Sequence, residues 1–88
     1  MTEQDIKGLI ESKLQGARVF VTDLQGTGDH FEAVVIAPQF KGKSRLNQHR
    51  LVYDACGDHL TKEIHALKLQ THSPDEWKKD PKNNARLA

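Results

Sequence analysis

Cysteine is almost absent from this sequence: its 88 residues include one, Cys56. A single thiol cannot form an internal disulfide, which is typical of a reducing compartment. The first residues, Met-Thr-Glu-Gln-Asp, lack the positive start and the apolar run of a signal peptide. No apolar stretch approaches the ~20 residues that a membrane span needs. We therefore expect a soluble, cytoplasmic protein with no membrane partner.

The sequence also lacks a strong charge of either sign. Thirteen basic and twelve acidic side chains leave a net charge of +1, far from the positive balance of a dedicated nucleic-acid-binding domain. The length suits one small domain with a modest core. The sequence does not determine an oligomeric state, and for the chain alone we expect a monomer or a weak dimer.

Motifs of catalysis are missing as well. The sequence has no nucleophile elbow, P-loop, paired-carboxylate motif or dinucleotide fingerprint. We therefore expect a protein that is not an enzyme.

Hydrophobic periodicity predicts six elements in the order helix–strand–strand–helix–strand–helix. The helices are expected over residues 3–15, 45–57 and from 74 onward, and the strands over 18–24, 31–37 and 64–70. The first two strands form an antiparallel hairpin around a glycine-containing turn. The third follows a helical crossover, which favours parallel pairing. The prediction is an α+β domain over residues 1–80, with a three-stranded mixed sheet covered on one face by helices, and a frayed tail over 81–88.

Capping residues support these boundaries. Thr2 with Asp5, and Ser44, occupy helix N-cap positions. The run Ser73-Pro74-Asp75-Glu76 fills the start of a helix that anchors Trp77.

The central helix is expected to pack through residues at helical spacing. These are Leu46, Val52, Tyr53 and Cys56. Cys56 is therefore interpreted as a small core residue rather than a ligand or nucleophile.

Five histidines, at positions 30, 49, 59, 65 and 72, invite comparison with known metal sites. The separations match neither a zinc finger nor a His-Glu-x-x-His motif. His49, His59 and His72 are interpreted as surface or half-exposed polar residues. His30, where the hairpin loop meets the second strand, and His65, at the opening of the third, could each be a solvated or sheet-end residue or a ligand.

Three motifs carry a resemblance. The run FKGKSRLNQHRLVY at 40–53, Ile64-His65-Ala66-Leu67, and Thr71-His72-Ser73-Pro74-Asp75-Glu76-Trp77 closely resemble the BolA family, over roughly residues 5 to 78. The resemblance implies a fold like the type II KH domain. It also implies a role beside monothiol glutaredoxins in iron–sulfur trafficking or in iron and stress regulation.

The same resemblance assigns ligands. His65 matches the C-terminal histidine of the family, and His30 matches a loop position where members carry histidine or cysteine. One thiol cannot hold an iron–sulfur cluster by the all-cysteine route. The family pattern implies a [2Fe–2S] cluster that is shared with glutaredoxin and glutathione and is not held by this chain alone, with imidazoles supplied from His65 and His30.

A basic turn supports a second hypothesis. Four positive charges lie within ten residues and without an intervening acid, at a helix start, where phosphates bind well. The charges are those of Lys41, Lys43, Arg45 and Arg50, and Gly42 supplies the turn between the two lysines. KH domains clamp nucleic acid with a Gly-x-x-Gly loop, but here Arg45 stands in place of the second glycine. The turn could thus bind DNA or RNA weakly, dock an acidic or glutathione-bearing partner, or be a solvated face.

Overall fold

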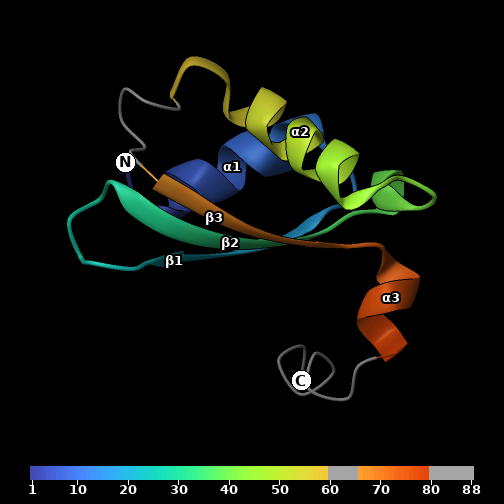
Figure 1. Ribbon diagram of the computed structural model, residues 1–88. Helices are drawn as coiled ribbons and strands as arrows, with labels where there is room; N and C mark the ends of the chain where they lie inside the picture. Colours follow the sequence, from blue (N-terminus) through green and yellow to red (C-terminus); the bar gives the residue numbers. More distant parts are fainter. Residues whose placement is uncertain (60–65, 80–88) are drawn as a thin grey trace.

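The computed structural model describes residues 1–59 and 66–79, and within them the predicted order of elements is confirmed (Figure 1). Two short 3-10 turns, η1 and η2, flank the central helix. The elements are α1 (Glu3–Lys13), β1 (Arg18–Asp23), β2 (His30–Ile36), η1 (Pro38–Phe40), α2 (Arg45–Cys56), η2 (Gly57–His59), β3 (Ala66–His72) and α3 (Pro74–Lys79). The tail expected to fray, residues 81–88, lies outside the described residues.

The sheet has the strand order β1-β2-β3 and is mixed, as expected. β1 pairs with β2 antiparallel, and β2 pairs with β3 parallel. The α+β class is therefore confirmed. The third strand runs two residues beyond its expected end, because Thr71 is buried beneath α2 and the cap of α3 begins only at Ser73.

The predicted helix caps form with their hydrogen bonds. The Thr2 hydroxyl accepts from the Asp5 amide at 3.1 Å, and the Asp5 carboxylate accepts from the Thr2 amide at 2.9 Å. The hydroxyl of Ser73 and the carboxylate of Glu76 form the same reciprocal pair at the start of α3. α1 ends two residues earlier than expected, because Gly16, at φ +80°, turns the chain toward β1.

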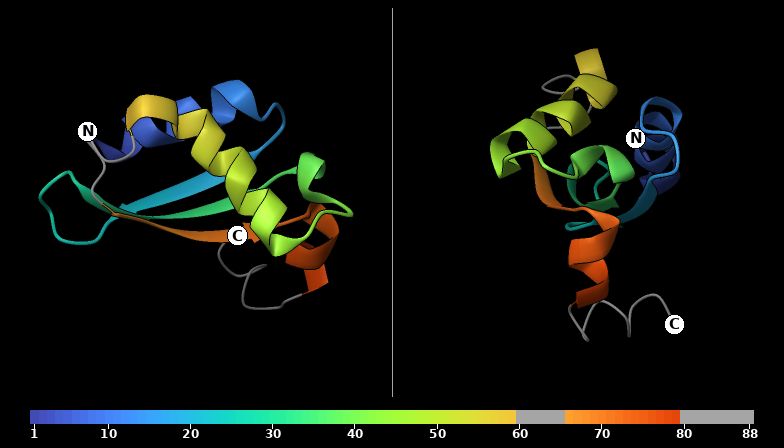
Figure 2. Two further views of the ribbon diagram at one scale, coloured as in Figure 1. Left: turned by 45° about the horizontal axis from the view of Figure 1, so that its top comes forward. Right: turned by 90° about the vertical axis from the view of Figure 1, so that its right-hand side faces the viewer.

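α1 and α2 lie side by side over one face of the sheet (Figure 2). The main core fills the space between this helical layer and the strands. It consists of Ile6, Ile10, Leu14, Val19, Phe31, Ala33, Val35, Ala37, Phe40, Val52 and Cys56. Cys56 is thus a core residue, as its spacing in the sequence predicts.

The opposite face carries a smaller cluster beneath α3, which lies on the other side of the sheet in both views (Figures 1 and 2). Trp77 packs there against Val34 and Ile36. Its indole stacks on Phe20, with ring centroids 6.3 Å apart. Both faces of β2 are consequently buried at its C-terminal end. The expected helical cover of one face describes α1 and α2, whereas α3 lies on the other face.

The predicted packing face of α2 is wrong in part. Leu46 and Tyr53 are 61% and 38% exposed, and the buried residues are Gln48, Val52, Ala55 and Cys56. These four recur at i, i+4, i+7 and i+8, a regular helical stripe. The apolar pattern did not reveal the stripe, because a glutamine occupies its first position.

Candidate functional site

His30 lies at one end of the sheet as the first residue of β2, where it pairs with Ala66 of β3. The Ala66 amide donates to the Asp29 carbonyl oxygen at 3.2 Å, which ties the two strands together at this point. His65, the other expected ligand, lies outside the described residues. In sequence it immediately precedes Ala66.

The His30 imidazole is oriented by its neighbour in the chain. Nδ1 of His30 lies 2.8 Å from a carboxylate oxygen of Asp29, and both side chains are about one-third exposed. A carboxylate beside Nδ1 favours the tautomer that carries its proton there, so that Nε2 bears the lone pair. Histidines that bind metals are commonly oriented by such a carboxylate. The residues at this position therefore fit a metal-ligating imidazole.

The hairpin loop before His30 is held by Asp23. Its two carboxylate oxygens accept from the amides of Gln25, Gly26 and Gly28 at 2.8 to 3.2 Å. The N-terminal ammonium donates to the Gly28 carbonyl oxygen at 3.2 Å. His30 thus begins a strand next to a hydrogen-bonded loop, at the junction of hairpin loop and second strand where the sequence analysis places it. The signal in the sequence was an aspartate before a glycine-rich turn, which is typical of side-chain-capped turns.

The one thiol of the chain lies in the core. Cys56 is 1% exposed, and burial raises the pKa of its thiol. A buried protonated thiol is a poor metal ligand and a poor nucleophile. His49, His59 and His72 are half-buried, as expected. Desolvation, and to a smaller extent the charge of Arg45, lowers the pKa of His49.

The basic turn is built around a buried amide that the sequence analysis did not identify. Gln48 is 3% exposed, and its Nε2 donates to the carbonyl oxygens of Phe40 and Lys43, both at 3.1 Å. Its Oε1 accepts from the Thr71 hydroxyl at 2.7 Å. Gly42, at φ +76°, supplies the backbone conformation that closes the turn. The turn is therefore fastened to both α2 and β3.

The expected basic residues have different roles in this turn. The Arg45 guanidinium donates to the Thr71 carbonyl oxygen and to Gln48 Oε1, and it lies 3.6 Å from a Glu76 carboxylate oxygen. Arg45 thus connects α2 to β3 and α3. Lys41, Lys43 and Arg50 are exposed.

His30 and the basic turn lie at opposite ends of the molecule (Figure 1). His30 is the first residue of β2, and Ile36 is the last residue of that strand. The basic turn comes after Ile36 and the short η1. A seven-residue strand spans about 20 Å. A partner that contacts both places must therefore extend along the whole sheet.

Replacement of Arg45 tests its structural role. We expect Arg45→Ala to lower the free energy of unfolding by about 1–2 kcal/mol. This loss is smaller than that expected for a fully buried charged hydrogen bond, because the Arg45 side chain is 53% exposed and solvent screens its charge. Arg50→Ala, the matched control on the same helix, should change it by less than about 0.5 kcal/mol. Urea denaturation measures both. Equal stability of the two variants would contradict the connecting role of Arg45.

The geometry defines a small α+β domain with an oriented imidazole at one end of a mixed sheet and a fastened basic turn at the other. The chain belongs to the BolA family: the family model for BolA-like protein matches residues 10–76. No helix in the described ranges is long and apolar enough to cross a membrane.

Individual relatives agree with this assignment. The chain is similar to Protein BOLA2 of Arabidopsis thaliana, with 35% identity over 89 residues that cover 99% of this chain and 95% of that protein. It is also similar to the DNA-binding transcriptional regulator BolA of Escherichia coli (strain K12), with 36% identity over 52 residues that cover 59% of this chain and 50% of that protein. The solved structure of a bolA protein homologue from Coxiella burnetii matches with a TM-score of 0.77 and 48% identity, over 89% of this chain and 97% of that one.

Proposed function

We propose that this protein is a non-enzymatic adaptor of the cytoplasm that binds a monothiol glutaredoxin and contributes imidazole ligands to a bridging [2Fe–2S] cluster. The ligands are His65 and His30. The observation that supports this most is the 2.8 Å contact between Nδ1 of His30 and the Asp29 carboxylate, because it orients an imidazole at the end of the sheet.

The need for a partner follows from the donor set. A [2Fe–2S] cluster takes four ligands, mostly thiolates, and histidine can replace cysteine on one iron. The one thiol of this chain is buried, with its pKa raised by burial, and so it does not serve. Glutaredoxin and its bound glutathione would supply the thiolates. The exposed residues Lys41, Lys43 and Arg50 are available to dock an acidic part of the same assembly.

Visible absorption and circular dichroism spectra test this function. The purified chain alone should be colourless and carry no cluster, and addition of a cluster-loaded monothiol glutaredoxin should change the cluster spectrum. Stoichiometric iron and sulfide in the isolated protein would contradict the need for a partner. An unchanged spectrum on mixing would contradict the adaptor function.

Replacement of His30 should tune the mixed complex rather than prevent its assembly. We expect His30→Ala to leave the complex assembled, because water, glutathione or another side chain can replace one imidazole in part, but to alter the spectrum or hasten cluster loss. His59→Ala is the matched control and should behave as wild type. Cluster release to a chelator, followed by absorbance, measures the effect. Failure of His30→Ala to form a complex with cluster-free glutaredoxin would be inconsistent with this role.

A second function is favoured by one specific observation: the similarity to a relative described as a DNA-binding transcriptional regulator. The exposed lysines of the basic turn would then contact phosphates at the start of α2. The footprint is small, because Arg45 is engaged within the fold and the second glycine of a KH loop is missing.

Salt dependence distinguishes this second function from the first. We expect only weak binding to DNA or RNA, without sequence preference, that is lost steeply as salt rises, since it depends on counterion release. Fluorescence anisotropy with labelled oligonucleotides at several salt concentrations measures it. Tight, sequence-selective binding at physiological salt that Lys43→Glu abolishes would favour the nucleic-acid function over the adaptor.

A further inference from the structure

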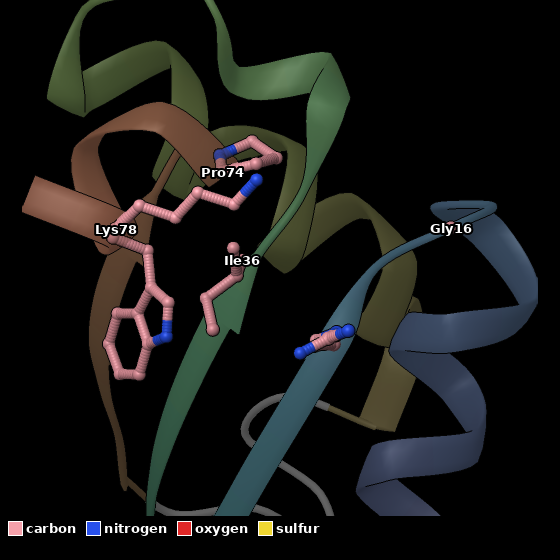
Figure 3. A pocket seen from close by; sticks show the side chains of 6 residues that line it. Gly16, Ile36, Pro74 and Lys78 are labelled. Carbon is pink, nitrogen blue, oxygen red and sulfur yellow. The ribbon is translucent and has the colours of Figure 1, made fainter. Parts of the chain in front are cut away.

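A pocket of about 200 Å³ opens between the sheet and α3, on the face opposite α1 and α2 (Figure 3). Its lining comes from three parts of the chain: the turn before β1, the paired ends of β1 and β2, and α3. The lining residues are Gly16, Arg18, Ile36, Pro74, Trp77 and Lys78. His30 begins β2, and Ile36 ends it, so the pocket lies at the other end of the strand from the proposed ligand site.

The register of the sheet places a cation beside an apolar floor. Arg18 and Ile36 are partners in the antiparallel pair of β1 and β2, so their side chains are neighbours on one face. Ile36 and Trp77 belong to the buried cluster on that face. The Lys78 side chain extends over the pocket toward Pro74 (Figure 3). Two basic side chains therefore border a floor of isoleucine, tryptophan and proline.

Two polar side chains on this face, Trp77 and Arg18, have N–H donors without an acceptor among the residues that the structure describes. Trp77 is 2% exposed, and its indole Nε1 has no hydrogen-bond partner among the described residues. A buried donor without a partner costs free energy. The guanidinium of Arg18, at the exposed rim, makes no ion pair or hydrogen bond within residues 1–59 and 66–79.

The chemistry of the lining selects an anion with an apolar part. The six lining residues include two bases and no acid. A guanidinium matches the two oxygens of a carboxylate in a bidentate pair, and the floor offers contact for a hydrocarbon group. The volume is below that of a typical drug-binding pocket, so the occupant is small.

We propose that this pocket binds a carboxylate that carries an apolar group. Arg18 and Lys78 hold the carboxylate, and the apolar group lies against Ile36 and Trp77. The same chemistry is offered by the C-terminal residue of a polypeptide and by a free aliphatic acid. This inference is independent of the adaptor function, since it uses none of the ligand residues.

The single tryptophan of the chain makes the test direct. The full-length protein, labelled with ¹⁵N, has one indole N–H resonance, and that resonance reports on Trp77. N-acetyl-L-leucine, which mimics a polypeptide C-terminus, and octanoate are titrated separately. N-acetyl-L-leucinamide, which lacks the negative charge, is the ligand control. We expect a saturable shift of the indole resonance with a Kd of about 1 mM for at least one acid.

Substitutions of the lining residues test whether the shift of the indole resonance comes from binding in the pocket. Arg18→Gln should weaken binding about tenfold, as should loss of the ligand charge in the amide. Arg18→Lys should retain part of the affinity, and Arg50→Gln, a basic residue outside the pocket, should bind as wild type. If Arg18→Gln does not give a native spectrum, Lys78→Gln makes the same test from α3.

The outcomes separate the sources of the ligand. Binding of N-acetyl-L-leucine alone supports a polypeptide terminus, binding of octanoate alone supports a free acid, and binding of both supports recognition of the shared chemistry. The proposal is overturned if neither acid gives a saturable shift, if the neutral amide binds as well as the acid, or if a folded Arg18→Gln variant binds as wild type.

Discussion

His65→Ala abolishes the visible circular dichroism of the mixed cluster with glutaredoxin: this is the largest functional effect that we expect from one substitution. Alanine has no lone pair to offer a metal, and the buried Cys56 cannot take its place. Titration of the variant with cluster-loaded glutaredoxin, followed in the visible range, measures the loss. The spectrum should be that of the glutaredoxin without this chain.

Folding controls separate a ligand from a structural histidine. The far-ultraviolet spectrum and the melting temperature of His65→Ala should stay close to wild type, and His59→Ala should retain the mixed spectrum. Cluster binding by the wild type should also weaken as pH falls through about 6.5, the ordinary pKa of a histidine side chain. The neutral imidazole is the ligating form, and protonation removes its lone pair. If His65→Ala unfolds the domain, or folds and still gives the wild-type cluster spectrum, the ligand assignment fails.

Trp77→Ala should produce the largest loss of stability. The indole is 2% exposed and packs α3 against Val34 and Ile36. Truncation of a buried tryptophan to alanine typically costs about 3–5 kcal/mol. That is a large fraction of the stability of a small domain, which is commonly about 5–15 kcal/mol. Urea denaturation followed by circular dichroism, which does not depend on the missing fluorophore, measures the change.

Two control substitutions separate the components of this effect. Trp77→Phe keeps an aromatic ring in the cluster and removes an indole N–H that has no partner among the described residues, so it should cost less than about 1.5 kcal/mol. Phe20→Ala removes a ring that is 41% exposed, and its cost should lie well below that of Trp77→Ala. Equal costs for Trp77→Ala and Phe20→Ala would show that α3 does not depend on the indole for its packing.

Local signals predicted most of the fold. The capping residues Thr2, Ser44 and Ser73 marked the helix starts correctly, because each cap hydrogen-bonds within three residues of itself. The glycine turn and the helical crossover indicated the antiparallel and parallel pairings, since chain connectivity limits how neighbouring strands can pair. Cys56 was assigned to the core for the same local reason, a regular helical spacing.

The remaining features depended on contacts between residues far apart in the sequence. The sequence alone determined the order of the elements, their starts and the family motifs, because these depend on neighbouring residues. Only the tertiary structure showed that Gln48 is buried, since its partner Thr71 lies 23 positions away. It likewise decided that Arg45 connects three elements, since its partners Thr71 and Glu76 also lie far along the chain. The direction in which a polar side chain points is set by the hydrogen-bond partners that the fold brings near it. The spacing of residues along the sequence does not identify those partners.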